Sequence, residues 1–272
     1  MSQFLTIVKE YLKDKKWATI LLGGITGLLG VFTIYILSEF DLEAMASIIA
    51  MLPEDIFDFF GGLVAMTNPY GWITMEVLGF IWLWAGIYLV FSASSLLSQD
   101  IEEKTIELFL SKPITRTKFL GSKIVSLYVV ITIMMALSFL IISGGIATSQ
   151  VFIDEGLYWD RLWGTYVTVV LFLSALSMIA FFGSTIFLNS KKAMVIGIVA
   201  LFLMFFIDGF YSYMEAIENL KYFTVFFYYN PLDYLVHADI DLYIRDIIVL
   251  TSINAALVIG SLIVFNKKDI PN

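Results

Sequence analysis

The stretch SQDIEEKTIELFLSKPITRTK, residues 98–118, separates two long apolar runs at residues 72–97 and 119–147. Eight of its 21 residues are charged, and it contains one proline. An apolar run of about 20 residues is long enough to cross a hydrocarbon core of about 30 Å as a helix. The two runs therefore predict a pair of membrane-spanning helices. Residues 98–118, here called the polar loop, are predicted to connect them on one side of the membrane.

Apolar runs of this length recur along the chain. Of its 272 residues 60% are hydrophobic, and the mean hydropathy is +0.88. Soluble domains are only roughly 45–50% apolar. We therefore expect an all-α integral membrane protein in which residues 1–272 form a single transmembrane domain. Six spans are expected, at residues 17–37, 72–97, 119–147, 162–188, 193–213 and 244–265.

The basic residues indicate which side of the membrane each connection faces. Thirteen of the 16 Lys and Arg residues fall on the side that holds both termini and the polar loop, and only Arg161, Lys221 and Arg245 fall on the other. Cytoplasmic connections carry an excess of Lys and Arg, so the termini and the polar loop are predicted to be cytoplasmic. This predicts a multi-pass protein of the cytoplasmic (plasma) membrane. The outer side holds 17 of the 24 acidic residues, which is typical of a solvated surface.

Three segments outside the spans carry further patterns. Residues 1–16 place lysines on one helical face and apolar residues on the other, which is typical of a helix lying in the inner membrane interface. The outer segments 39–71 and 214–243 are too long for simple turns, so they predict re-entrant or interfacial helices. The apolar face of the first segment consists of Phe4, Leu5, Val8, Tyr11 and Leu12.

Glycines recur inside two of the predicted spans. Gly23, Gly27 and Gly30 lie in the first span, and Gly144 and Gly145 lie in the third. Small residues let the backbones of two membrane helices approach closely. These positions therefore predict seams of close helix packing.

The polar loop has the pattern of an amphipathic helix. Asp100, Glu103 and Glu107 are spaced i, i+3, i+7 and fall on one face, beside an apolar face. Like charges four residues apart weaken an isolated helix by a few tenths of a kcal/mol, so the stripe favours neutralisation by a basic partner surface. Pro113 is expected to end this helix, and Thr115 to cap the next one.

The sequence excludes several classes of site. Cysteine is absent, so neither a disulfide nor a thiolate site is possible, and the single histidine, His237, argues against a His-based metal cluster. His237 lies near Asp233, Asp239 and Asp241, but an exposed loop is favoured there over a divalent-metal site, and no metal is expected. The chain has no glycine-rich phosphate-binding loop ending in Gly-Lys-Ser/Thr, so any ATP would bind to another subunit. The absence of HExxH and GxSxG motifs disfavours an intramembrane enzyme.

Two carboxylates fall inside predicted spans. Glu76 lies near the start of the second span and Asp208 near the outer end of the fifth. An ionisable residue in a span is a candidate functional residue, because burying its charge without a partner costs a few kcal/mol. We therefore treat both as candidates for a substrate path, with hydrated helix ends as the alternative.

Within and beyond the polar loop, the run EEKTIELFLSKPITRTKFLGSK, residues 102–123, resembles the signature loop of ABC-2 type transporter permeases. In that family an acidic pair is followed by a basic residue, an apolar-Glu-apolar-apolar turn, and then Pro and Ser/Thr-Arg. The runs YYNPLDYL, residues 228–235, and FNKKDI, residues 265–270, are similar to two weaker features of the family. With the six-span layout, the resemblance covers nearly the whole chain.

The resemblance implies the permease subunit of an ABC exporter for an amphiphilic substrate, peptide or lipid-like. It implies pairing with a second copy or a homologous permease, in a lipid bilayer, and with a separately encoded ABC ATPase. ATP and Mg would reside in that ATPase, with no cofactor in this chain and no nucleic-acid partner. The polar loop would be the coupling helix, and the transport path would lie at a dimer interface formed by spans one, two and five. The alternative is a non-transporting membrane sensor or scaffold that recruits a soluble partner through the same loop. The positions that match the coupling element are Asp100, Ile101, Glu102, Glu103, Lys104, Thr105, Glu107, Leu108, Pro113 and Arg116.

Overall fold

Six helices long and apolar enough to cross a membrane dominate the computed structural model of the chain. The structure describes residues 3–39, 66–102 and 115–268, and in those ranges the regular secondary structure is helical, without strands. The expectation of an all-α membrane protein with six spans is confirmed. The spans are α1 (Gln3–Leu37), the segment Pro69–Glu102, α8 (Arg116–Thr148), α10 (Trp159–Phe187), α11 (Ser190–Phe210) and α13 (Ile240–Lys267).

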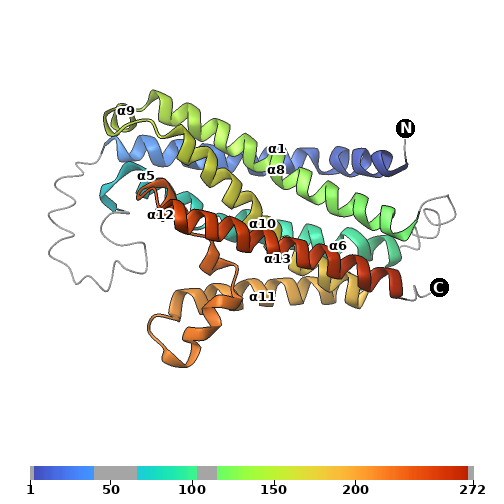
Figure 1. Ribbon diagram of the computed structural model, residues 1–272. Helices are drawn as coiled ribbons and strands as arrows, with labels where there is room; N and C mark the ends of the chain where they lie inside the picture. Colours follow the sequence, from blue (N-terminus) through green and yellow to red (C-terminus); the bar gives the residue numbers. More distant parts are fainter. Residues whose placement is uncertain (1–2, 40–65, 103–114, 269–272) are drawn as a thin grey trace.

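The spans run side by side, with α10 at the centre (Figure 1). Helix α10 packs against α8, α11, α13 and α6 (Ile87–Glu102), whereas α1 packs mainly along α8. Helices α1 and α8 lie on one side of the bundle and α11 lies on the other (Figure 1). Phe172 and Phe181 of α10 are fully buried, so the hydrophobic core follows this helix.

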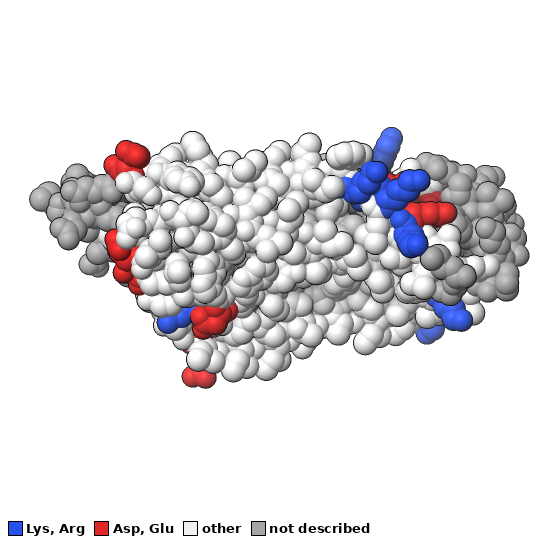
Figure 2. Space-filling view, turned by 90° about the horizontal axis from the view of Figure 1, so that it is seen from above, with Lys and Arg blue, Asp and Glu red and all other residues white. Residues whose placement is uncertain are grey.

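The two ends of the bundle differ in charge. Figure 2 shows Lys and Arg gathered at one end and most of the visible Asp and Glu at the other. Both termini lie at the basic end, as an even number of spans requires (Figure 1). We call the end with the termini the basic end and the opposite one the acidic end. Among the described residues, the basic end carries Lys15, Lys16, Lys123, Lys191, Lys192 and Lys267, and the acidic end carries Glu155, Asp160, Glu215, Glu218, Asp239 and Asp241.

The first span differs from the expectation of a separate interfacial helix at residues 1–16. Helix α1 is a single helix of 35 residues, or about 52 Å at 1.5 Å per residue. Ile7 and Val8 in its first turns are buried, and the hydroxyl of Tyr11 shares a hydrogen bond of 2.9 Å with Ser92 of α6. Residues 3–16 therefore pack against the bundle through Ile7, Val8 and Tyr11, and they continue into the first span as one helix.

The predicted glycine seam lies between α1 and α8. A Cβ atom on Gly23 would lie 2.6 Å from the backbone oxygen of Met134, and one on Gly30 would lie 2.5 Å from Ile142. Ser138 of α8 uses this closeness to donate a 2.9 Å hydrogen bond to the carbonyl of Gly23. The contact between α1 and α8 therefore requires glycine at these positions, which confirms the prediction of close packing for the first span.

The second span begins irregularly at the acidic end. It consists of α5 (Pro69–Ile73), two π-helical segments, η1 (Thr74–Leu78) and η2 (Trp82–Gly86), and then α6. The side chain of Asn68 caps α5 by accepting hydrogen bonds from the backbone N–H groups of Tyr70 and Gly71. Short π-helical segments within α-helices are frequent at functional sites. Glu76 lies in η1.

Short helices also fill the predicted outer segment at residues 214–243. They are the 3-10 helices η3 (Glu215–Phe223) and η4 (Phe226–Tyr228) and the α-helix α12 (Pro231–Leu235). A further short α-helix, α9 (Gln150–Glu155), follows α8. Of the other outer segment, residues 39–71, residues 40–65 lie outside the described residues, and its end contains α5.

Candidate functional site

The polar loop is described at both of its ends. Residues 98–102 form the last turn of α6, and Thr115 caps α8 by accepting a 3.3 Å hydrogen bond from the backbone N–H of Lys118, as predicted. Of the ten candidate coupling positions, four are in described residues: Asp100, Ile101, Glu102 and Arg116. The remaining candidates, which lie outside the described residues, are Glu103, Lys104, Thr105, Glu107, Leu108 and Pro113.

Asp100 binds within the chain. Its carboxylate lies 2.6 Å from the ammonium of Lys123 on α8, and the two side chains are 19% and 11% exposed. Ile101 beside it is buried. An ion pair so shielded from water is less screened than one at the surface, so it links the end of α6 firmly to α8.

Glu102 connects α6 to α11. Its two carboxylate oxygens accept hydrogen bonds of 2.9 and 3.1 Å from the backbone N–H and the hydroxyl of Ser190, the first residue of α11. The hydroxyls of Ser98 and Ser190 share a further hydrogen bond of 2.8 Å. A carboxylate at a helix N-terminus is stabilised by the unpaired N–H groups and by the helix dipole. Glu102 therefore ties the loop to the beginning of α11.

Arg116 connects the other end of the loop to the C-terminal helix. Its guanidinium donates a 2.8 Å hydrogen bond to the carbonyl oxygen of Lys268, just after α13. The Lys268 ammonium in turn donates to the carbonyl of Ile186 near the end of α10. Both ends of the loop are thus held by contacts at the basic end, together called the basic-end hub, which link α6, α8, α10, α11 and α13. It consists of Asp100–Lys123, Glu102–Ser190, Arg116–Lys268 and Lys268–Ile186.

A cavity of about 390 Å³ lies at the acidic end, here called the outer cavity. Its walls come from η1 and η2 of the second span, the end of α11, and the segment around η4 and α12. Two carboxylates line it, those of Asp208 on α11 and Asp233 on α12. Half of its other lining residues are aromatic, including Trp82, Phe205, Tyr211, Phe226, Phe227 and Tyr229.

The structure places the two predicted path carboxylates differently. Asp208 is half-buried in the last turn of α11 and makes no hydrogen bond or ion pair with the described residues. Glu76 is exposed and lies outside the cavity lining. The carboxylate that shares the cavity with Asp208 is Asp233, which sequence reasoning had treated only as a neighbour of His237. The feature of the sequence that could have singled out Asp233 is its position two residues after Pro231, in the first turn of a short helix.

Asp233 lies in a partly apolar environment outside the spans. Burial raises the pKa of its carboxyl, and Asp239 adds to this effect, whereas His237 and Arg245 oppose it. The guanidinium of Arg245 near Asp233 therefore offsets part of the negative charge of this carboxylate.

One wall of the outer cavity is held by buried polar contacts. Asp246 of α13 is 2% exposed and accepts hydrogen bonds of 2.6 and 2.9 Å from Arg245 and one of 2.9 Å from Asn230. The hydroxyl of Tyr229 donates to the carbonyl of Leu78 at 3.0 Å, and its ring stacks on Phe172 with centroids 4.1 Å apart. These contacts fix the Tyr229–Asn230 turn against α10, α13 and the second span.

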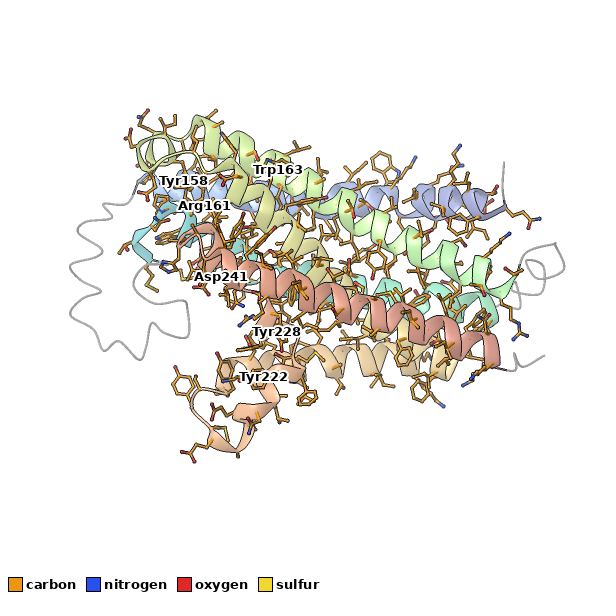
Figure 3. All side chains as sticks on the ribbon, in the orientation of Figure 1. Tyr158, Arg161, Trp163, Tyr222, Tyr228 and Asp241 are labelled. Carbon is orange, nitrogen blue, oxygen red and sulfur yellow. The ribbon has the colours of Figure 1, made fainter. Side chains whose placement is uncertain are left out.

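Cationic side chains lie on aromatic rings at the edge of this cavity. The Lys221 ammonium is 5.0 Å from the ring centroid of Tyr211 and 5.7 Å from that of Phe227. The Arg245 guanidinium lies 5.2 Å from Phe227. Figure 3 shows Tyr222 and Tyr228, which also pack on these cations, on the segment that follows α11.

A second cavity, of about 330 Å³, lies at the basic end. It is lined by Lys15 of α1, by residues of α6 including Ser92 and Ser95, and by Ser190 and Lys191 of α11. The second span and α11 therefore line both cavities, one at each end of the bundle.

The chain matches a sequence family over residues 15–269, and that family is described as ABC-2 family transporter protein. The match takes in the six membrane-spanning helices, with α1 included from residue 15 onward. It also includes the basic-end hub and the lining residues of both cavities. No curated protein matches the chain.

Proposed function

The chain belongs to the ABC-2 family of transporter proteins, and we propose that it is the permease subunit of an exporter that moves an amphiphilic substrate, peptide or lipid-like, across the cytoplasmic membrane. Family membership makes it a multi-pass membrane subunit of an ABC transporter. A separate ABC ATPase would bind the polar loop from the cytoplasm, and a second copy or a homologous permease would complete the membrane part.

The observation that carries this proposal is the connection made by α11. Its first residue, Ser190, is bound by Glu102 at the end of the polar loop, and its last turn carries Asp208 in the outer cavity. The helix has 21 residues, about 32 Å at 1.5 Å per residue, which is close to the thickness of the hydrocarbon core. A displacement of the loop by an ATPase would therefore reach the far side of the membrane through one rigid element.

The basic-end hub would spread the same displacement over the bundle. Asp100 transmits it to α8 through Lys123, and Arg116 transmits it to α13 and α10 through Lys268. The two cavities, both lined by the second span and α11, would form the two ends of the substrate path. Of the two carboxylates predicted for this path, Asp208 lies in the outer cavity lining and Glu76 lies outside it.

Charge reversal in the polar loop tests the ATPase-binding part of the proposal. Glu103→Lys with Glu107→Lys should abolish copurification of the partner ABC ATPase, coexpressed with this chain, and ATP-driven transport, because the reversed stripe would then repel a basic docking surface. The matched control is Glu215→Lys with Glu218→Lys, the same charge change in η3 at the acidic end, which should leave copurification intact. If the loop variant copurifies with the ATPase as well as the parent does, the polar loop is not the docking site.

A further inference from the structure

We propose that the outer cavity binds an organic ammonium group, with Asp208 as its counter-ion. The inference rests on the proposed function, because it names the class of substrate that the path would accept. A cavity of about 390 Å³ is within the range of small-molecule sites, roughly 300–1,000 Å³, and is much larger than a single water needs.

Asp208 supplies the negative charge. It is half-buried in an aromatic environment and has no ion pair or hydrogen bond among the described residues. It also lies in the last turn of α11, where the helix dipole presents its negative end and disfavours a carboxylate. A bound cation would offset both the partial burial of this negative charge and the unfavourable helix dipole. A neutral or anionic ligand would offset neither.

Trp82 is a fixed part of the aromatic wall. Its side chain lines the cavity and is 3% exposed. The ring is held by Phe205, with centroids 4.3 Å apart, and by Phe202 and Phe226, each at 5.7 Å. Its indole N–H is itself buried, so it is not assigned to the ligand.

The aromatic walls favour the same class of ligand. Tyr211 and Phe227 line the cavity, and the chain already places its own Lys221 ammonium 5.0 and 5.7 Å from their ring centroids. Ammonium ions are attracted to the faces of such rings. The carboxylate of Asp233 adds to the negative potential of the cavity, but the guanidinium of Arg245 nearby partly offsets its charge. Asp208 is therefore the carboxylate assigned to the ligand.

Binding is tested on the full chain in nanodiscs of zwitterionic lipid, without any ATPase. The probe is Nα-acetyl-lysine N-methylamide, whose ammonium, with a pKa near 10.4, is charged at pH 7 and is joined to two carbonyl acceptors. One control is its Nε-acetyl derivative, which keeps the acceptors and loses the charge. The other is butylammonium, which keeps the charge and lacks the acceptors. Saturation-transfer NMR titrations provide the dissociation constants.

The probe should bind at least tenfold more tightly than its Nε-acetyl derivative, and Asp208→Asn should remove that difference. Butylammonium should also bind to the parent chain and lose that binding in Asp208→Asn, because it keeps the positive charge that pairs with Asp208. Asp241→Asn is the matched control: this exposed carboxylate lies at the same end, in the first turn of α13 and outside the cavity lining (Figure 3).

Equal binding of the probe and its Nε-acetyl derivative would overturn the inference, and so would a charge preference that survives Asp208→Asn. Either result would leave the proposed ATPase docking untouched, because copurification depends on the polar loop at the opposite end. Conversely, unchanged copurification of the loop variant with the ATPase would contradict the docking proposal but would not affect the measured binding of the ammonium probe. The two failures are therefore distinguishable.

Discussion

Three carboxylates near the helix ends are bound to partners in the chain. Asp100 contacts Lys123, Glu102 receives two hydrogen bonds from Ser190, and Asp246 is enclosed by Arg245 and Asn230. Each of them joins two elements, so their charges are used for structure. Asp208 differs because it lines a cavity and has no such partner among the described residues, which leaves its charge available to a ligand.

The pair between Asp100 and Lys123 can be tested by removing one partner. Asp100→Asn should lower the free energy of unfolding by about 1–3 kcal/mol, because the shielded Lys123 ammonium loses its counter-charge. The measurement is thermal unfolding of the purified chain in nanodiscs. Combining Asp100→Asn with Lys123→Met should cost less than the sum of the single changes, since the two residues act as a unit. Strictly additive costs would show that the pair contributes nothing.

At the level of single elements, α1 shows how packing joins two predicted segments. The sequence predicts a boundary near residue 16, where lysines give way to apolar residues, but no Pro or Gly occurs between Gln3 and Leu22 to end a helix. The partners that make one helix favourable, Ser92 among them, are far away in the sequence. The continuity of α1 across residue 16 was therefore not predictable from local pattern alone.

The seam between α1 and α8 provides a matched pair of tests on neighbouring glycines. Gly23→Ala should destabilise the fold by about 1–3 kcal/mol, because its Cβ would lie 2.6 Å from the Met134 backbone oxygen and the helices would have to separate. Gly24→Ala should be neutral or stabilise by up to about 1 kcal/mol, since no atom lies within 4 Å of its added Cβ and alanine favours the helix. Thermal unfolding of the two variants, measured side by side, checks both values. Equal effects would show that this contact does not limit the approach of the two helices.

The second span was predicted as a helix but not as an irregular one. The hydrophobic pattern of residues 72–97 fits a regular α-helix and a helix that contains π-helical segments equally well. The structure places η1 and η2 where the span borders the outer cavity, with Thr74 and Trp82 in its lining. The widened turns therefore belong to the candidate site, and their presence depends on tertiary packing.

At the level of the whole molecule, the six spans and the charge difference between the ends could be predicted because both depend on composition and spacing. The outer cavity could not, because its walls come from segments more than 100 residues apart, such as those of Trp82 and Asp233. Sequence reasoning found Asp208 by its charge inside an apolar run. It passed over Trp82 because a tryptophan among apolar residues carries no sign that it lines a cavity.

The same charge difference predicts the orientation of the molecule in the membrane, and this prediction can be tested directly. The chain has no cysteine, so a single introduced thiol can be labelled without background. Asn219→Cys, at an exposed position of η3 at the acidic end, should react with a membrane-impermeant maleimide in intact cells. Lys13→Cys in α1 and Ser111→Cys in the polar loop should react only after the cells are permeabilised.

This pattern is expected because Lys and Arg are retained on the cytoplasmic side during insertion. The reverse pattern would place the polar loop outside the cell, away from cytoplasmic ATP, and no ATPase could then dock on it. Binding of the ammonium probe to the outer cavity would survive such a result, but that cavity would then face the cytoplasm. The labelling experiment therefore decides which end of α11 lies on the cytoplasmic side, where an ATPase can dock, and which end lies on the opposite side of the membrane.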